Sequence, residues 1–178
     1  MAVLLEALLP RVLPDLRFLC LPHEGKKDLE ASIPRKLRAW KEPGVHFVVV
    51  HDNDGADCVA LKERLQRRCA EGRRADTLVR IACQELEAWY LGDGPALADA
   101  YGRAALADLG AKRGFRDPDA VQRPSEQVSN LVPEFQKISG ARLMGARLSE
   151  ETNSSTSFRT FMTGVRRLAA SLPPAGQA

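Results

Sequence analysis

The feature that most constrains the fold is the run VHFVVV at residues 45–50. A continuous, β-branched apolar run is typical of a central strand covered on both faces. The segments TLVRIAC (77–83) and LRFLCL (16–21) have a similar character, and we expect strands there as well. Segments with helical spacing, 28–41 and 58–68, separate these three runs. The alternation predicts an α/β fold with a parallel or mixed sheet flanked by helices.

The length of 178 residues fits one domain. We expect residues 1–110 to form an α/β core that begins with a helix at 2–13, and residues 111–178 to form a helical C-terminal extension. Pro34 is predicted to interrupt the helical pattern of residues 28–41. The segments 136–148 and 154 onward are predicted to be helical, with Ile138 facing inward in the former.

Composition excludes several classes of protein. Hydrophobic residues make up 44% and charged residues 28%, which is enough for a core and unlike a disordered chain. No apolar run has the length of a membrane helix, and the N-terminus lacks the features of a signal peptide, so we expect a cytoplasmic location. The four cysteines form no Cys-x-x-Cys pair, which argues against a zinc ribbon.

Acidic side chains follow two of the expected strands. Asp52 and Asp54 come directly after VHFVVV, and Glu85 and Glu87 come directly after TLVRIAC. Because the carboxyl ends of parallel strands meet at one edge of a sheet, we expect these carboxylates to converge. Carboxylate oxygens are the ligands of Mg²⁺ and Mn²⁺, so the pattern favours a metal site for phosphoryl chemistry. The alternative is that the Asp-Asn-Asp segment forms a turn that caps the next helix.

A weaker signal follows the expected strand at 16–21. Glu24 is a further candidate acid there, and Lys26 and Lys27 could contact a phosphate at a helix start. Solvated lysines are the ordinary alternative.

Several motifs together resemble the bacterial domain-of-unknown-function 4276 family, which belongs to the Toprim-like group. The resemblance is carried by HEGKKDL, FVVVHDNDGADC, RIACQELEAWYLGD, FRDPDAV, RPSE, QKISGAR and SFRTF, so it covers most of the chain. It implies a Toprim-like, Rossmann-like fold. Toprim domains bind Mg²⁺ through a Glu after the first strand and an Asp-x-Asp after a later one. Asp52 and Asp54 match the Asp-x-Asp, and Glu85 resembles the further acid of some Toprim nucleases, with Glu87 as the competing choice.

The first-strand Glu of the Toprim pattern has no clear counterpart. Only 28 positions separate Glu24 from Asp52, which is fewer than the Toprim order requires. Aligning 2–13 with the first helix and 16–21 with the second strand fits better, and it places the first strand upstream of Met1. We therefore expect that this strand is missing from the sequence.

The resemblance implies a Mg²⁺- or Mn²⁺-dependent nuclease that cleaves phosphodiester bonds in DNA or RNA. Related Toprim nucleases often work with an ATPase, so an ATPase encoded nearby is an expected partner, in defence against foreign DNA. The alternatives are a degenerate Toprim-like binding or regulatory subunit and a different Mg²⁺-dependent phosphotransfer activity on a nucleotide.

Overall fold

The computed structural model describes residues 1–172 and centres on a small parallel sheet. Strand β1 (Val48–Asp52) pairs with β2 (Leu78–Ala82), with Val48 opposite Leu78 and Asp52 opposite Ala82. Both strands are rich in β-branched residues, and the 14-residue helix α3 makes the crossover between them. A helix between two parallel strands is the connection that parallel pairing requires.

Helices make up most of the rest of the described chain. They are α1 (Ala2–Val12), α2 (Lys26–Ala39), α3 (Cys58–Glu71), α4 (Glu87–Leu91), α5 (Gly94–Tyr101), α6 (Pro124–Leu131), α7 (Lys137–Gly145) and α8 (Thr156–Ala170). Four short 3-10 helices (Ala104–Leu106, Leu109–Ala111, Arg113–Phe115 and Pro118–Ala120) connect α5 to α6. No helix within residues 1–172 is long and apolar enough to cross a membrane.

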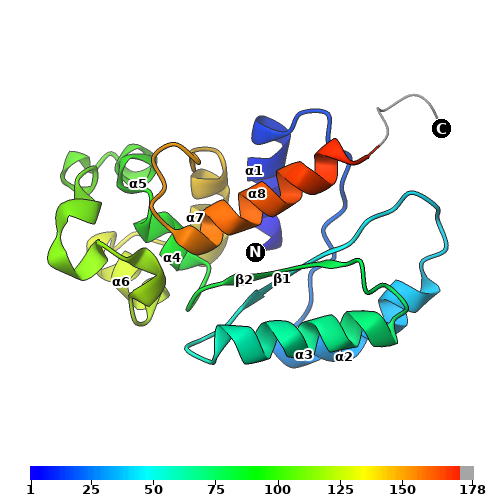
Figure 1. The fold of residues 1–178 in the computed structure, drawn as a ribbon. Coiled ribbons are helices and arrows are strands. Elements are labelled where there is room, and N and C mark those ends of the chain that lie inside the picture. Colours follow the sequence, from blue (N-terminus) through cyan, green and yellow to red (C-terminus); the bar gives the residue numbers. More distant parts are fainter. Residues whose placement is uncertain (173–178) are drawn as a thin grey trace.

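The sheet lies between two layers of helices (Figure 1). Helices α2 and α3 lie side by side beneath it and bury a small cluster that includes Ile33, Leu65 and Val79. Helix α8 crosses the opposite face, where Phe161 lies in a larger cluster with residues from α1, α4, α5 and α7. Trp89 anchors this larger cluster, and its ring centroid lies 5.2 Å from that of Phe161. The carboxyl ends of both strands point toward α4 and α6, which places the strand exits beside those helices.

The prediction of a β-strand at residues 16–21 is wrong. This segment is extended but joins no ladder, and the sheet of the described chain has two strands. Leu19 is 69% exposed and Leu21 43% exposed, so the apolar pattern is not explained by burial. The physical reason is the lack of a neighbour, because an extended segment becomes a strand only when a partner strand accepts its backbone hydrogen bonds.

Three other expectations need correction. Pro34 does not interrupt α2, although proline has no N–H and so removes one backbone hydrogen bond of the helix. The packing of Ile33 and Leu37 beneath the sheet compensates for that lost bond. The first strand begins at Val48 rather than Val45. Ile138 is 67% exposed, and Ala141 and Met144 supply the inward face of α7 instead.

Candidate site at the strand exits

Asn53 ties the two strand exits together. Its backbone N–H donates to the Ala82 carbonyl at 3.2 Å, and its side-chain oxygen accepts from the Gln84 N–H. The chain then turns sharply at Asp54 and Gln84, which adopt φ angles of 47° and 61°. These left-handed conformations are uncommon for residues other than glycine, and they occur where the surrounding structure compensates for the strain. The Asn53 bonds are that compensation, and they fix the positions of the acids on either side.

Asp52 ends β1 with an unsatisfied carboxylate. Its Oδ1 atom is buried and has no hydrogen-bond partner among the described residues. Burial raises the pKa of Asp52, although the nearby Lys26 ammonium and the amino group of Met1 act in the opposite direction. A buried carboxylate oxygen without a donor is costly, so its presence needs an explanation other than stability.

Asp54 lies differently from Asp52. Its side chain is 56% exposed and forms an ion pair with Lys26, the first residue of α2. Lys26 also acts electrostatically on Asp52, so a single ammonium group neutralises charge on both members of the Asp-x-Asp pair. The lysine therefore stands where a cation shared by the two carboxylates would be expected.

Glu85 and Glu87 come close to Asp52 from the β2 exit. The charges of both Glu85 and Asp52 raise the pKa of Glu87, although burial is the larger cause of that rise. Glu85 accepts a hydrogen bond from the Ser125 N–H at 2.8 Å, so one of its oxygens caps the N-terminus of α6. The four predicted carboxylates thus lie at one edge of the sheet. Asp54 and Glu85 have partners there, whereas Asp52 has an oxygen without one.

The remaining predicted residues lie apart from this group. Lys27 and Glu24 are exposed. Within residues 1–172, no group of three or more His, Cys, Asp or Glu side chains is arranged to hold a metal ion.

Tyr90 lies in the core, and the charges of two of the acids act on its hydroxyl group. The residue is 1% exposed, and its hydroxyl has no partner among the described residues. Burial raises the pKa of Tyr90 well above its ordinary value, and the charges of Glu87 and Asp52 add to the rise. The helical spacing of Glu87 and Tyr90, three positions apart on α4, could have revealed that they share a face.

A second polar network, centred on Asp119, lies next to the end of β2. Asp119 accepts hydrogen bonds from the hydroxyls of Ser155 and Ser157 at 2.7 and 2.9 Å and from the Ser157 N–H at 2.7 Å. The Ser157 hydroxyl in turn accepts from the Trp89 indole at 2.8 Å. Burial, with Asp119 and Cys58 nearby, raises the pKa of the Cys83 thiol to about 12. These residues have satisfied partners, so we assign them to holding α8 and α4 in place.

The arrangement at the strand exits has a definite chemical character. Asp52 and Tyr90 present two buried oxygen atoms without hydrogen-bond partners, and Lys26 supplies a positive charge near Asp52. The carboxylate oxygen of Asp52 suits a hard divalent cation, and the raised pKa of Asp52 also suits proton transfer.

Comparison with known proteins adds one finding. No curated protein and no solved structure matches the chain. The model of one protein family, described as "Domain of unknown function (DUF4276)", matches residues 3–166. Because this match spans most of the sequence, the chain belongs to the DUF4276 family.

Proposed function

We propose that the protein is a Toprim-like, divalent-metal-dependent enzyme that cleaves phosphodiester bonds. The observation that carries the proposal is the buried Oδ1 atom of Asp52, which has no hydrogen-bond donor at the carboxyl edge of a parallel sheet. This edge is where α/β folds place their sites. A stable fold gains nothing from such an atom, whereas a metal site requires an available carboxylate oxygen.

Asp52 would hold a Mg²⁺ or Mn²⁺ ion, with Asp54 as a second ligand once Lys26 moves from it. The ion would stabilise negative charge on the phosphoryl oxygens of the substrate. Glu87 is buried and has a raised pKa, so it suits the exchange of a proton with water or a leaving group. Glu85 orients this region through the Ser125 N–H, and Lys26 would contact a substrate phosphate.

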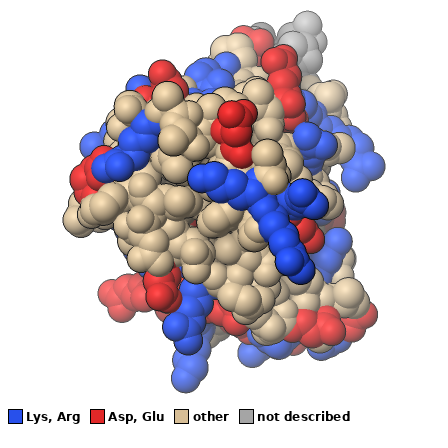
Figure 2. All heavy atoms as spheres, turned by 90° about the vertical axis from the view of Figure 1, so that its left-hand side faces the viewer, with Lys and Arg blue, Asp and Glu red and all other residues tan. Residues whose placement is uncertain are grey.

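The proposed substrate is DNA or RNA, and the proposed partner is an ATPase, working in the cytoplasm. On the face viewed from the α5 and α6 end, Lys and Arg side chains are dispersed among Asp, Glu and uncharged residues (Figure 2). Such mixed charge is unlike the continuous basic surface that usually tracks a nucleic-acid backbone. We therefore base the proposed substrate contact on the carboxylates and Lys26 at the strand exits, and not on a basic surface.

A second candidate function is a binding or regulatory subunit without catalysis. Two observations favour it: Lys26 already pairs with Asp54, and Glu85 is engaged as a helix cap. In this case the acids would be relics of a site whose cation has been replaced by a lysine.

Calorimetric titration with Mn²⁺ and cleavage of plasmid and single-stranded DNA separate the two candidates. The enzyme proposal expects saturable Mn²⁺ binding and metal-dependent cleavage, and Asp52→Ala should abolish both. The exposed Asp108 serves as the control, because Asp108→Asn removes one carboxylate elsewhere and should change neither measurement. If wild type and Asp52→Ala behave alike in both assays, with and without an added ATPase, the enzyme proposal fails and the subunit stands.

A further inference from the structure

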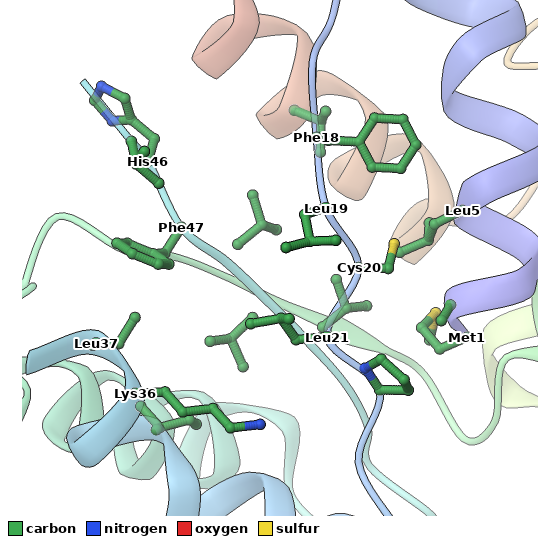
Figure 3. Close-up of a pocket in the computed structure, with 18 of the residues that line it drawn as sticks. Met1, Leu5, Phe18, Leu19, Cys20, Leu21, Lys36, Leu37, His46 and Phe47 are labelled. Atoms are coloured by element: carbon green, nitrogen blue, oxygen red, sulfur yellow. The ribbon is translucent and has the colours of Figure 1, made fainter. Parts of the chain in front are cut away.

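A large cavity lies on the side of β1 that faces away from β2. Its volume is about 1000 Å³, and it is bounded by β1, by the extended segment 16–23, and by residues of α1, α2 and α8. Figure 3 shows Leu19 and Leu21 extending from the 16–23 segment, with Leu37 of α2 and Leu5 of α1 at its other walls. We call this cavity the β1 slot.

One wall of the β1 slot is an unpaired strand edge. Phe47 accepts a hydrogen bond from the Leu78 N–H, and the Asn53 N–H donates to Ala82, so the odd-numbered residues of β1 bond toward β2. Backbone direction alternates along a strand, so the N–H and C=O groups of Val48 and Val50 and the N–H of Asp52 point into the slot. None of these groups has a hydrogen-bond partner within residues 1–172; the Asp52 carbonyl, in contrast, accepts from the His51 ring at 2.6 Å.

The opposite wall of the slot carries exposed apolar side chains and joins no β-ladder. Residues 16–21 are held extended without a ladder, and their apolar side chains Phe18, Leu19 and Leu21 are 37%, 69% and 43% exposed. Exposed apolar groups gathered on one surface mark a binding site more often than isolated ones do. The slot therefore offers unpaired backbone on one side and uncovered apolar side chains on the other.

The faces of the slot identify what would fill it. Phe161, Val165 and Leu168 of α8 line one face, and Leu29, Ile33 and Leu37 of α2 line the other. An occupant in line with β1 would be covered on both faces, as in the interior of a parallel sheet, and would need apolar side chains in both directions. A row of alternating N–H and C=O groups is matched by another strand's backbone and not by a helix or a lipid.

We propose that the β1 slot is a docking site for one extended, largely apolar strand of a partner polypeptide, which adds to the sheet beside β1. Three basic side chains (Arg17, Lys26 and Lys36) and two acidic ones (Glu42 and Asp52) line the slot, so acidic residues flanking the apolar strand would match the excess of positive charge. This inference is independent of the proposed catalytic function, since it rests on the sheet edge and the apolar walls.

The probe for this site is a labelled peptide of about six Val and Thr residues with Glu at both ends, which is the length of an ordinary strand. A second peptide, with proline at alternate positions, keeps the apolar character but cannot form a ladder. The same strand fused ahead of Met1 through a short linker gives a form in which the site is saturated, because Met1 itself lines the slot.

Binding is measured by fluorescence anisotropy and by hydrogen exchange of the full-length protein. We expect saturable binding of the first peptide, with new protection of the Val48, Val50 and Asp52 amides, and the same protection in the fused form. Leu19→Lys should weaken binding by at least about tenfold, because it puts a charge where the strand would bury a leucine. Ile138→Lys is the matched control, since Ile138 is 67% exposed on α7 and lies outside the slot, and it should change nothing.

Three results would overturn the proposal. The first is equal affinity for the proline peptide, which would indicate apolar adsorption without a ladder. The second is unchanged exchange of the three amides with both the peptide and the fused strand. The third is dimerisation of the protein alone with protection of the same amides, which would identify the occupant as a second copy.

Discussion

Two aspartates, Asp52 at the end of β1 and Asp93 at the N-cap of α5, should respond in opposite ways to the same substitution. Asp52 has an oxygen without a donor, whereas Asp93, which is 0% exposed, accepts hydrogen bonds from Ala96, Thr152 and Ser149 at 3.2, 2.8 and 2.8 Å. We predict that Asp52→Asn stabilises the protein at neutral pH and that Asp93→Asn destabilises it.

The magnitudes follow from these contacts. A charged group that is buried without a partner costs more than a neutral one, so replacing the Asp52 carboxylate by a neutral amide should recover the difference, on the order of 1 kcal/mol. For a domain of this size, each kcal/mol shifts Tm by roughly 2–4 °C. Asn at position 93 would direct an NH₂ group at donors that now meet a carboxylate, which we expect to cost about 2–4 kcal/mol.

The pH dependence of the Asp52 effect has a definite sign. The pKa of Asp52 is raised in the folded state, so the unfolded chain ionises more readily and the folded chain is penalised once the pH exceeds the unfolded value. The stabilisation by Asp52→Asn should therefore vanish below about pH 3.9, where Asp52 is protonated in both states, and increase as the pH rises above that value.

Urea unfolding followed by circular dichroism, at neutral and acidic pH, measures both free energies. Asp108→Asn controls for the loss of one negative charge at an exposed position. If Asp52→Asn lowers the free energy of unfolding as much as Asp93→Asn does, Asp52 is a structural residue, and the reasoning that assigns it to a functional site is refuted.

Three further predictions concern the surroundings of the site. Asp119→Ala removes the acceptor of the Ser157 N–H and of two hydroxyls, and thermal unfolding should report a loss of about 2–4 kcal/mol. Glu85→Gln weakens the cap of α6 and should speed hydrogen exchange in that helix, at a cost of about 0.5–2 kcal/mol. Lys26→Gln frees Asp54 of its ion pair, so calorimetry should show tighter Mn²⁺ binding; weaker binding would contradict the view that the lysine competes with the metal.

The sequence predicted the central sheet and the convergence of the acids because both depend on short-range patterns. The runs around β1 and β2 are apolar, β-branched and separated by one helix, which suffices to place Asp52 and Glu85 at the same edge. The helix of residues 156–170 was likewise predictable, since Ser155 caps it and Phe158, Phe161 and Val165 lie on one face.

The rest depends on partners that the local pattern does not reveal. The segment 16–21 has the composition of a strand, and whether it becomes one depends on a neighbouring strand in the fold. Lys26 and Lys27 are indistinguishable in the sequence, yet one meets Asp54 and the other is exposed, because helical rotation separates adjacent side chains. The engagement of Glu85 with Ser125 joins residues 40 positions apart, which spacing alone could not predict.

The β1 slot and the strand-exit site share Asp52 and Lys26, and Asp52 in particular connects the two proposals. The backbone N–H of Asp52 belongs to the open strand edge, while its carboxylate belongs to the acidic group. The amino group of Met1, which lines the slot, is among the charges that lower the pKa of this carboxylate. A strand in the slot would exclude water from Asp52 and move Met1 from it, so it would change the affinity of the carboxylate for a cation.

If the docked strand and Mn²⁺ affect each other's binding, thermodynamic linkage requires the two effects to be equal. Whatever factor the docked strand imposes on the Kd of Mn²⁺, saturating Mn²⁺ must impose the same factor on the Kd of the strand. Titrating wild type with Mn²⁺ in the presence and absence of the Val/Thr peptide, and then reversing the order, measures both. Equal factors different from one would show that strand addition regulates the site. If each ligand binds and the two factors are both one, Asp52 does not connect them, and the slot and the acids act independently.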